Sequence, residues 1–347
     1  MSDAATVQAQ RLQDFVQALF VHAGLSAQAA HDVARALIWA DLRGIDTHGV
    51  SRVAFYLNFM QKGVIKVQPQ RRVLHETPAV QVFDADASAG AVAMFHAAEQ
   101  AALKARALGL GLVMVRGTTH TGALGCYTQA LARQGMVGIA LAASIPLMAY
   151  HGAKAAGVST APLSIAVPGP HDEPLILDMA SGAMSMGQLR AAKQSGTPLP
   201  AGLALSEQGE PTTDPQQASI VLPMAGPKGS GLALMFELLC SLVVGNPIIA
   251  DFLSDKPGGR KHRQNAWLLA IDISRFGDVA HYQQEVARTV AALAGLPAST
   301  AGEPVRMPGD RGLQCQAERL LDGIPLPAAL CKELAACARP KGLALPW

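Results

Sequence analysis

The chain has 347 residues, of which 50% are hydrophobic and 16% are charged, and its formal net charge at pH 7 is +2. This length and apolar content predict a large buried core divided among two or three lobes, and they exclude an intrinsically disordered chain. The small net charge provides no electrostatic footprint for nucleic acid, so we expect no nucleic-acid partner.

The five cysteines and the longest apolar runs indicate the cellular compartment of the protein. The cysteines form no CxxC pair, so the sequence predicts neither a disulfide framework nor a zinc site and favours a reducing compartment. The first residues lack the basic-then-apolar pattern of a signal peptide. The longest apolar runs, 137–150 and 232–245, are too short to span a bilayer and are interpreted as buried elements. We therefore expect a cytoplasmic protein with no metal and no membrane partner.

Three helices are predicted in the N-terminal part of the chain. Apolar residues recur at helical spacing over 12–20. Ser26 is placed to cap a second helix, which ends near Gly44, and a third helix is predicted to begin at Asp46. Together these helices predict a small helical lobe over residues 1–75.

From about residue 80 onward, strands and helices alternate. The patterns predict strands over 80–83, 111–115, 137–142, 164–167, 175–177 and 267–273, and helices over 88–108, 123–134, 231–244 and 279–293. This order predicts a mixed α/β body over residues 76–295. Prolines recur after it, so residues 296–347 are predicted to form an irregular arm with short helices that packs back on the body.

The segment 41–52 carries the strongest candidate for catalysis. Gly44 ends one predicted helix and Asp46 is placed to cap the next, which puts His48 in the first helical turn. The helix dipole disfavours a positive charge at that position. It would therefore lower the pKa of His48 and favour a neutral imidazole that accepts a proton near pH 7.

Arg52 lies four residues after His48 and therefore on the same face of the predicted helix. A guanidinium can hold a carboxylate by two parallel hydrogen bonds, which would place the neighbouring C2 hydroxyl group near His48. Thr47 is placed to hydrogen-bond to the imidazole and orient it. In the alternative interpretation, His48 is an ordinary residue of a capped helix and Arg52 is a surface cation, so the pair needs support from other clusters.

Three further clusters are candidates for binding a phosphate-bearing ligand. Residues 116–125 follow a predicted strand and open a helix, whose free N–H groups favour phosphate, although the glycines do not match the GxGxxG pattern of a Rossmann fold. Lys228 lies at the glycine-rich start of a helix within 223–231, and 306–311 carries two arginines in a constrained turn. Taken alone, 116–125 is better explained as a polar strand-to-helix turn, and each of the other two clusters is a weak signal. The basic cluster 260–263 is interpreted as a solvated loop.

In combination these clusters resemble a known family. The chain reads RGIDTHGVSR at 43–52, HTGALGCY at 120–127, LDMASG at 177–182, GEPTTDP at 209–215, GPKGSGLALMFELL at 226–239 and RMPGDR at 306–311. These six ordered segments resemble the malate/L-lactate dehydrogenase family that is distinct from the Rossmann-type enzymes, over roughly residues 10–325. The resemblance implies an α/β (α+β) fold in which a largely antiparallel, non-Rossmann sheet binds NAD(P) beside the helical lobe. It also implies a small carboxylate substrate and a homodimer with active sites near the subunit interface.

The same resemblance implies roles for individual residues. His48 matches the proton donor or acceptor of the family, and Thr47 matches the residue that supports it. Arg52 matches the carboxylate clamp, and Thr160 matches a substrate-side threonine. The positions similar to cofactor contacts are His120, Thr121, Gly122, Ala123, Leu124, Asp178, Met179, Ala180, Lys228, Arg306, Met307, Pro308, Gly309, Asp310, Arg311 and Gly312.

Two positions depart from the family pattern. Ala161 stands where the family usually has Asn, between a threonine and a proline. Gln188 stands where the hydroxy acid branch commonly has Lys and where the cyclic imine reductases have an Asp that assists the histidine. We count Gln188 among the catalytic positions, although a neutral amide can only orient a substrate and cannot supply charge.

Three functional hypotheses follow. The first is hydride transfer between NAD or NADP and a small 2-hydroxy acid or the matching 2-oxo acid. The second is NADPH-dependent reduction of a cyclic imine, such as piperideine- or pyrroline-2-carboxylate, and the third is a non-catalytic binding protein that has kept the fold. The sequence does not choose between NAD and NADP, because no acidic ribose-binding position can be placed without the Rossmann pattern.

Overall fold

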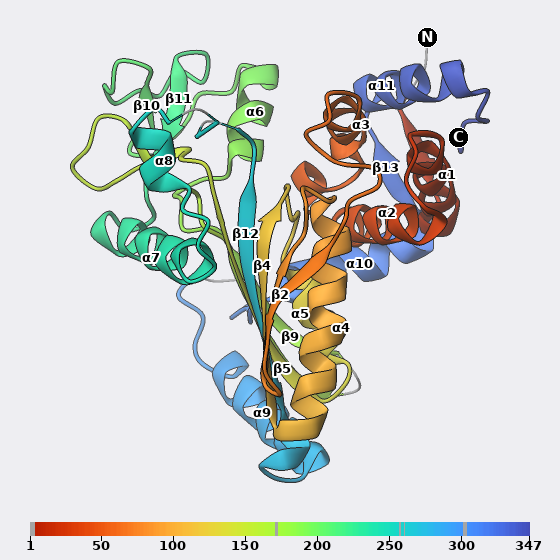
Figure 1. The fold of residues 1–347 in the computed structure, drawn as a ribbon, viewed down its shortest axis with the longest axis vertical. Helices are drawn as coiled ribbons and strands as arrows, with labels where there is room; N and C mark the ends of the chain where they lie inside the picture. The colour runs from red at the N-terminus through yellow and green to blue at the C-terminus, as the bar shows by residue number, and fades with distance from the viewer. Residues whose placement is uncertain (1–3, 171–172, 257, 260, 301–303) are drawn as a thin grey trace.

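The computed structural model describes residues 4–170, 173–256, 258–259, 261–300 and 304–347. Figure 1 shows a long sheet that carries one lobe on each side of its upper end: a helical lobe built from both termini, and a smaller lobe that contains a second sheet. Arg260 of the basic cluster at 260–263 lies outside the described residues. The predicted domain boundaries at 75 and 295 stay predictions.

The helical lobe combines the N-terminal helices with the end of the chain. It contains α1 (Ala9–His22), α2 (Ala27–Leu42), α3 (Val53–Gln61) and α11 (Ala328–Ala338). The 3₁₀ turn η6 (Arg339–Lys341) follows α11 in the sequence. The short strands β1 (Ala5–Val7) and β13 (Ile324–Leu326) pair antiparallel and tie the two ends of the chain together. The Ser26 side chain accepts a hydrogen bond from the Ala29 N–H, as predicted for the cap of the second helix.

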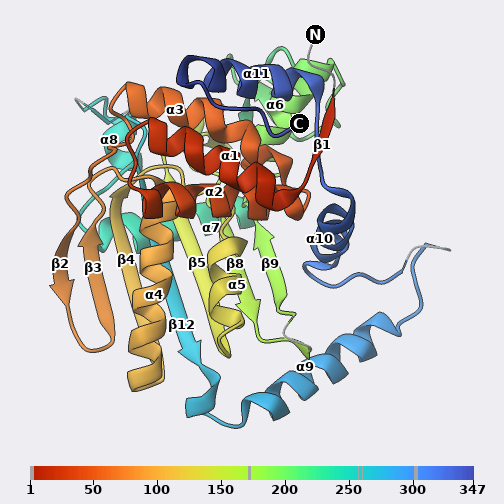
Figure 2. The same cartoon turned by 90° about the vertical axis from the view of Figure 1, so that its right-hand side faces the viewer.

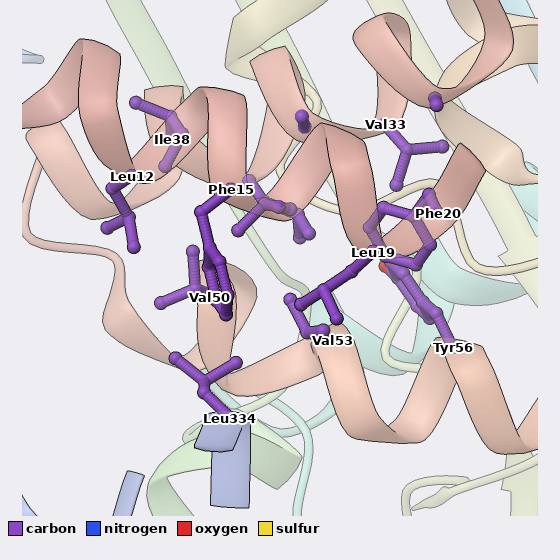
Figure 3. Packing of buried hydrophobic residues seen from close by; sticks show 14 of the residues in the cluster. Leu12, Phe15, Leu19, Phe20, Val33, Ile38, Val50, Val53, Tyr56 and Leu334 are labelled. Carbon is purple, nitrogen blue, oxygen red and sulfur yellow. The ribbon is translucent and has the colours of Figure 1, made fainter. Parts of the chain in front are cut away.

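Figure 3 shows why these helices pack. Large apolar side chains of α1 and α2, such as Leu12 and Val33, point into one cluster, which Val53 of α3 and Leu334 of α11 complete. Each of these four side chains is at most 1% exposed. Burial of a side chain of this size stabilises the fold by about 1.5–3 kcal/mol, so α11 is an integral part of the helical lobe.

The long sheet has the strand order β2-β3-β4-β12-β5-β8-β9. Its strands are β2 (Arg72–Glu76), β3 (Val80–Asp84), β4 (Leu110–Thr118), β12 (Gln264–Asp272), β5 (Met136–Ser144), β8 (Leu163–Val167) and β9 (Leu175–Met179). Only β3 and β4 pair in parallel, and every other neighbouring pair in this sheet is antiparallel. The expected non-Rossmann, largely antiparallel sheet is therefore confirmed.

Two helices cover one face of the long sheet, as Figure 2 shows: α4 (Gly90–Leu108) and α5 (Gly125–Ala132). The face of α4 toward the sheet is made of alanines, among them Ala97 and Ala101, which are fully buried. A Cβ at Gly111 of β4 would lie 2.2 Å from the Ala101 carbonyl oxygen. Small residues on both elements thus allow the helix backbone to approach the strand closely.

The smaller lobe contains a four-stranded sheet with the order β10-β11-β6-β7. The elements of this lobe are β6 (Met148–Ala149), β7 (Ala156–Val158), α6 (Met186–Ser195), β10 (Ala204–Ser206), β11 (Ala218–Val221), α7 (Pro227–Glu237), the π-helix η4 (Leu238–Leu242) and α8 (Ile249–Leu253). After β12 come the 3₁₀ turn η5 (Ile273–Arg275), α9 (Val279–Ala294) and α10 (Asp310–Asp322). The C-terminal segment therefore holds two regular helices, α10 and α11, rather than an irregular arm.

The interpretation of the apolar run 232–245 as a buried element is correct for one face only. On α7 and η4 one face, including Ala233, Phe236 and Cys240, packs against the sheet. The other face is exposed and consists of Leu232, Met235, Leu238, Leu239, Leu242 and Val243. The sequence of an apolar run does not show which faces of the helix pack against other elements of the same chain. No helix among the described residues is long and apolar enough to cross a membrane.

Candidate active site

The predicted third helix is wrong in its first two turns. Instead of one α-helix from Asp46, the chain forms two short 3₁₀ turns, η1 (Asp46–His48) and η2 (Val50–Arg52), before α3 begins at Val53. The break lies at Gly49, whose ψ angle of −150° is not helical. His48 and Arg52 therefore belong to a compact bend rather than to one face of a helix.

A buried carboxyl group explains this bend. The Asp41 side chain accepts a hydrogen bond from the Val50 N–H at 2.8 Å, and a Cβ at Gly49 would overlap its Oδ1 atom. Burial raises the pKa of Asp41 to about 8. Asp46, predicted as a helix cap, instead forms an ion pair with Arg319 of α10. The bend is thus held from α2 on one side and from α10 on the other.

His48 lies against a second histidine. Its Nδ1 atom is 3.0 Å from the Thr47 hydroxyl, as expected for an orienting group. Its ring stacks on that of His120, with centroids 5.5 Å apart and planes 21° apart. The His120 Nδ1 atom in turn is 2.7 Å from the hydroxyl group of Tyr56. The bend and the turn after β4, which are far apart in the sequence, therefore meet as a pair of stacked imidazoles.

Both imidazoles are neutral at pH 7. Burial, followed by the nearby charges of Arg52 and Arg190, lowers the pKa of His48 to about 4. Burial also lowers the pKa of His120 well below its usual value. The neutral His48 inferred from the sequence thus has burial, not a helix dipole, as its main cause.

Arg52 is the guanidinium at this end of the site. Its side chain is only 7% exposed, and its Nε atom donates to the Thr47 carbonyl oxygen at 2.6 Å. No described residue accepts a hydrogen bond from either of its Nη atoms. Two parallel N–H donors are therefore available for a planar acid group.

The predicted site residues gather around one cavity of about 730 Å³. Those that line it are Thr47, His48, Arg52, His120, Thr121, Gly122, Ala123, Thr160, Asp178, Met179, Ala180, Gln188, Arg306, Met307, Pro308, Gly309, Arg311 and Gly312. A volume of this size accommodates a ligand larger than a small acid alone. The place of a Cβ at Gly122, where φ is +74°, has no heavy atom within 4 Å, so a ligand can approach this turn closely.

Three predicted cofactor residues do not line this cavity. Leu124 is fully buried in the core beneath it. Lys228 is exposed at the start of α7. The Asp310 carboxylate accepts a hydrogen bond from the Met307 N–H at 2.7 Å and so shapes the turn that lines the cavity.

Arg43 and Asp178 organise another part of the cavity wall. The Arg43 guanidinium donates to the carbonyl oxygen of Gly309 at 3.1 Å and to the side chain of Gln316 at 3.2 Å. The Asp178 carboxylate accepts from the Gly125 N–H at 2.8 Å, and burial raises its pKa to about 6. These contacts fix the segment 306–312 and the start of α5 beside the cavity.

The two positions that depart from the family pattern have structural roles. The Gln188 side chain accepts from the Ser185 N–H at 2.8 Å and completes the capping box of α6. Its catalytic role stays a prediction. Ala161 is buried with a φ of +30°, a conformation in which an L-residue other than Asn or Asp is strained. Thr160 beside it lines the cavity, and its carbonyl oxygen accepts from Ser181.

Neither Tyr56 nor Arg43 is among the site residues predicted from the sequence. Arg43 was inside the quoted segment 43–52, but nothing in its spacing distinguishes a cavity residue from a helix end. Tyr56 contacts His120 from 64 positions away, and only the fold brings these two side chains together. No cluster of three or more potential metal-ligating side chains occurs in the described part of the chain.

Fold and site together define a protein in which a buried, neutral imidazole and a buried guanidinium line one cavity, built on a sheet that is not a Rossmann fold. The family model described as malate/L-lactate dehydrogenase matches residues 7–335. The chain belongs to this family, which confirms the resemblance drawn from the six sequence segments.

Individual relatives agree over nearly the whole chain. The chain is 33% identical over 320 residues to (2R)-3-sulfolactate dehydrogenase (NADP(+)) of Chromohalobacter salexigens, covering 91% of this chain and 92% of that protein. The solved structure of malate dehydrogenase from Pyrococcus horikoshii superimposes with a TM-score of 0.88 at 27% identity, covering 98% of this chain and 97% of the other. That of Δ1-piperideine-2-carboxylate reductase from Pseudomonas syringae pvar. tomato gives 0.85 at 28% identity, covering 96% and 100%.

Proposed function

We propose that the protein transfers a hydride between a small 2-hydroxy acid and NAD or NADP, forming or consuming the matching 2-oxo acid. The observation that carries this proposal is the bend at 47–52. It places a neutral imidazole and a guanidinium with two free donors on the wall of one cavity. The family to which the chain belongs supports the same chemistry.

Three residues of the bend have separate roles in the proposed reaction. Arg52 holds the substrate carboxylate through its Nη atoms, which brings the C2 hydroxyl group toward His48. The Thr47 hydroxyl accepts from the Nδ1–H of His48, so that Nε2 is free to take the hydroxyl proton. When bound, NAD(P) supplies the hydride acceptor or donor at C2. In the opposite direction, the imidazolium of His48 returns the proton to the oxygen.

The cofactor has a matching space in the rest of the cavity. The turn at 121–123, residues 178–180 and the segment 306–312 line it, and Gly122 leaves room for close approach. These segments come from β4, β9 and the start of α10, so the ligand would lie along one end of the long sheet. Arg43 and Asp178 hold these segments in place and are themselves bonded to protein atoms.

The test uses His48→Ala. Purified protein is given NAD⁺ or NADP⁺ with malate, lactate, ureidoglycolate and sulfolactate, and reduced nicotinamide is followed by absorbance. We expect turnover by the wild type and a loss of about 10²–10⁴-fold in the variant, because a proton-transfer group is removed. Cofactor binding should be retained. A wild type as inactive as the variant would instead support a non-catalytic binding protein.

A second candidate function is reduction of a cyclic imine that carries a carboxylate. The structural likeness to a piperideine-2-carboxylate reductase favours it, and Arg52 would hold that carboxylate equally well. NADPH consumption with piperideine-2-carboxylate, together with none in the presence of 2-oxo acids, would favour imine reduction over the oxidation of 2-hydroxy acids.

We also propose that the chain forms a homodimer and works in the cytoplasm. The exposed apolar face of α7 and η4 supports self-association, because monomers rarely leave such a patch uncovered. All five cysteines are free thiols, which suits a reducing compartment. Light scattering should give twice the 36.1 kDa mass of the chain, and Leu239→Glu should shift it toward the single mass. A monomeric wild type would contradict the dimer.

A further inference from the structure

Gln264 lines the cavity but lies outside the segments to which we assign the substrate and the cofactor. It is the first residue of β12, which lies between β4 and β5 in the long sheet. In the antiparallel pairing with β5, Gln264 lies opposite Ser144, which lines the same cavity. Directly opposed residues of antiparallel strands project to one face of the sheet. The Gln264 side chain therefore leaves the sheet on the side of the cavity.

The oxygen of the Gln264 amide is held by the protein. Oε1 accepts hydrogen bonds from the Thr121 N–H at 3.1 Å and from the Thr121 hydroxyl group at 3.2 Å. A backbone N–H can only donate, so its partner is the amide oxygen, and this fixes which way the amide faces. Thr121 is only 3% exposed, and its carbonyl oxygen accepts from the Tyr127 hydroxyl group at 2.6 Å. The turn that holds the Gln264 oxygen is thus itself anchored in the core.

The nitrogen of the same amide is open. No described residue accepts a hydrogen bond from the Nε2 atom of Gln264, and this atom is not among the described polar atoms that are buried without a partner. The next residue, Asn265, projects to the other face of the sheet and has both amide atoms bonded within the protein. Its Nδ2 atom donates to Ser241 and to the Asn246 carbonyl oxygen, and its Oδ1 atom accepts from the Gly117 N–H. Two N–H donors left unpaired on a cavity wall are placed for a ligand.

The turn that holds Gln264 leads directly to the residues proposed for hydride transfer. Thr121 follows His120 in the chain, and the His120 ring stacks on that of His48. The hydride would move between C2 of the substrate, next to His48, and the nicotinamide ring, so this ring must also lie near His48. Its carboxamide group is attached to the carbon next to the one that carries the hydride. The carboxamide oxygen is an acceptor that needs a donor from the protein.

We propose that the Nε2 atom of Gln264 donates a hydrogen bond to the carboxamide oxygen of the nicotinamide and so fixes the orientation of the ring in the cavity. The inference rests on the proposed function and adds a cofactor-binding residue to it. The neutral amide of Gln264 matches the neutral carboxamide, whereas the charged Arg52 matches the substrate carboxylate. A ring held in this way cannot rotate about its bond to the ribose and presents one face to the substrate.

The test measures the binding of two ligands that differ by the nicotinamide ring. The first is the reduced cofactor that the wild type binds, NADH or NADPH. The second is ADP-ribose or its 2′-phosphate, which keeps the rest of that cofactor. Calorimetry at pH 8 gives each Kd for the wild type, Gln264→Leu and Gln264→Glu. Leu removes the whole amide, whereas Glu keeps an oxygen for Thr121 and, when ionised, has no donor.

Gln264→Leu should bind the reduced cofactor about 3- to 10-fold more weakly, as for the loss of one neutral hydrogen bond. Gln264→Glu should lose at least as much, because its carboxylate would face the carboxamide oxygen. For the ADP-ribose ligand, Kd should stay within about twofold in both variants, since this ligand has no carboxamide.

Gln134→Leu is the matched control, because it makes the same change at a glutamine that does not line the cavity. The Gln134 amide donates to the Ala130 carbonyl oxygen at 2.7 Å and accepts from Arg106. This variant should bind both ligands like the wild type.

The outcomes distinguish this inference from the proposed function. Weaker binding of the reduced cofactor alone, in both Gln264 variants, supports the inference. An equal loss for both ligands, or a Gln264 variant of either kind that binds the reduced cofactor like the wild type, overturns the inference alone. In the first of these cases Gln264 only supports the turn at Thr121. A wild type that binds neither NADH nor NADPH overturns the proposed function and the inference with it.

Discussion

Two buried arginines on the wall of the cavity differ in how the protein uses their donors. Arg43 and Arg52 are both 7% exposed. The Nη atoms of Arg43 donate to Gly309 and Gln316. Among the described residues, Arg52 donates only from Nε, to the Thr47 carbonyl oxygen. A buried charge whose donors are filled by the protein stabilises the fold, while one whose donors are open is placed for a ligand. Burial alone therefore does not separate structural from functional arginines.

The two arginines also differ in the carboxylates near them. The surroundings of Arg43 include Asp178 and Glu173, which influence it electrostatically. Arg52 is influenced by Tyr56 and Arg190, and by no carboxylate of the described residues. Carboxylates of the protein thus influence Arg43, whereas a bound anion would supply the negative charge beside Arg52.

The largest expected effect is at Arg52. Arg52→Ala should lower kcat/KM for the hydroxy acid about 100- to 1,000-fold, because two charge-assisted hydrogen bonds to the carboxylate are lost. Steady-state kinetics at saturating cofactor measure this. Thermal stability should change little. A variant that loses stability but keeps its specific activity would mean that Arg52 has a structural role and does not bind the substrate.

Arg43→Ala should have the complementary effect. It leaves the Gly309 carbonyl oxygen and the Gln316 side chain without their donors, so we expect a loss of about 2–4 kcal/mol in the free energy of unfolding. Urea denaturation followed by circular dichroism measures it. Unchanged stability together with a large rise in KM for the acid would mean that Arg43, and not Arg52, holds the substrate.

A smaller effect is expected at the buried carboxyl group beneath the bend. Burial raises the pKa of Asp41 to about 8, against about 3.9 in an unfolded chain. Between these values the folded protein binds more protons than the unfolded chain. The contribution of Asp41 to the free energy of unfolding therefore falls as pH rises, by at most about 1.4 kcal/mol per unit, until pH passes the folded pKa.

Asp41→Asn removes this titration while keeping an acceptor for the Val50 N–H. The wild type should lose more stability than the variant between about pH 5.5 and about pH 7.5, within the range set by the two pKa values. Melting temperatures at the two pH values, measured for both proteins, provide the comparison. Parallel pH dependence in the two proteins would show that Asp41 is ionised in the folded state.

The smallest effect is expected at Tyr56. Tyr56→Phe removes the hydroxyl group that contacts the Nδ1 atom of His120 and leaves the ring in place. Loss of one neutral hydrogen bond should lower kcat by about 5- to 10-fold with little change in KM for the acid. A change in KM alone would mean that the hydroxyl group binds substrate rather than orienting the imidazole.

Local patterns predicted the parts of the fold that depend on local forces. The cap at Ser26, the helix over 88–108 and the alternating strands all follow from residues near one another in the sequence. The break at Gly49 does not, because it depends on a carboxyl group eight residues earlier that occupies the space of a side chain. A helical pattern cannot reveal such an overlap.

The candidate site shows the same limit. His48, Thr47 and Arg52 were found because they share one short segment, and the cofactor segments were found through the family resemblance. Tyr56 was missed because its partner, His120, lies on another element. Contacts between distant segments determine the charge balance of the site.

The most direct measurement is a crystal structure of the protein with NAD(P)H and oxamate, an unreactive analogue of a 2-oxo acid. We expect the oxamate carboxylate to accept hydrogen bonds of about 2.7–2.9 Å from both Nη atoms of Arg52. The adjacent oxygen should lie within reach of Nε2 of His48. A carboxylate bound to Arg43 instead, or a His48 ring that faces away from the ligand, would contradict the account.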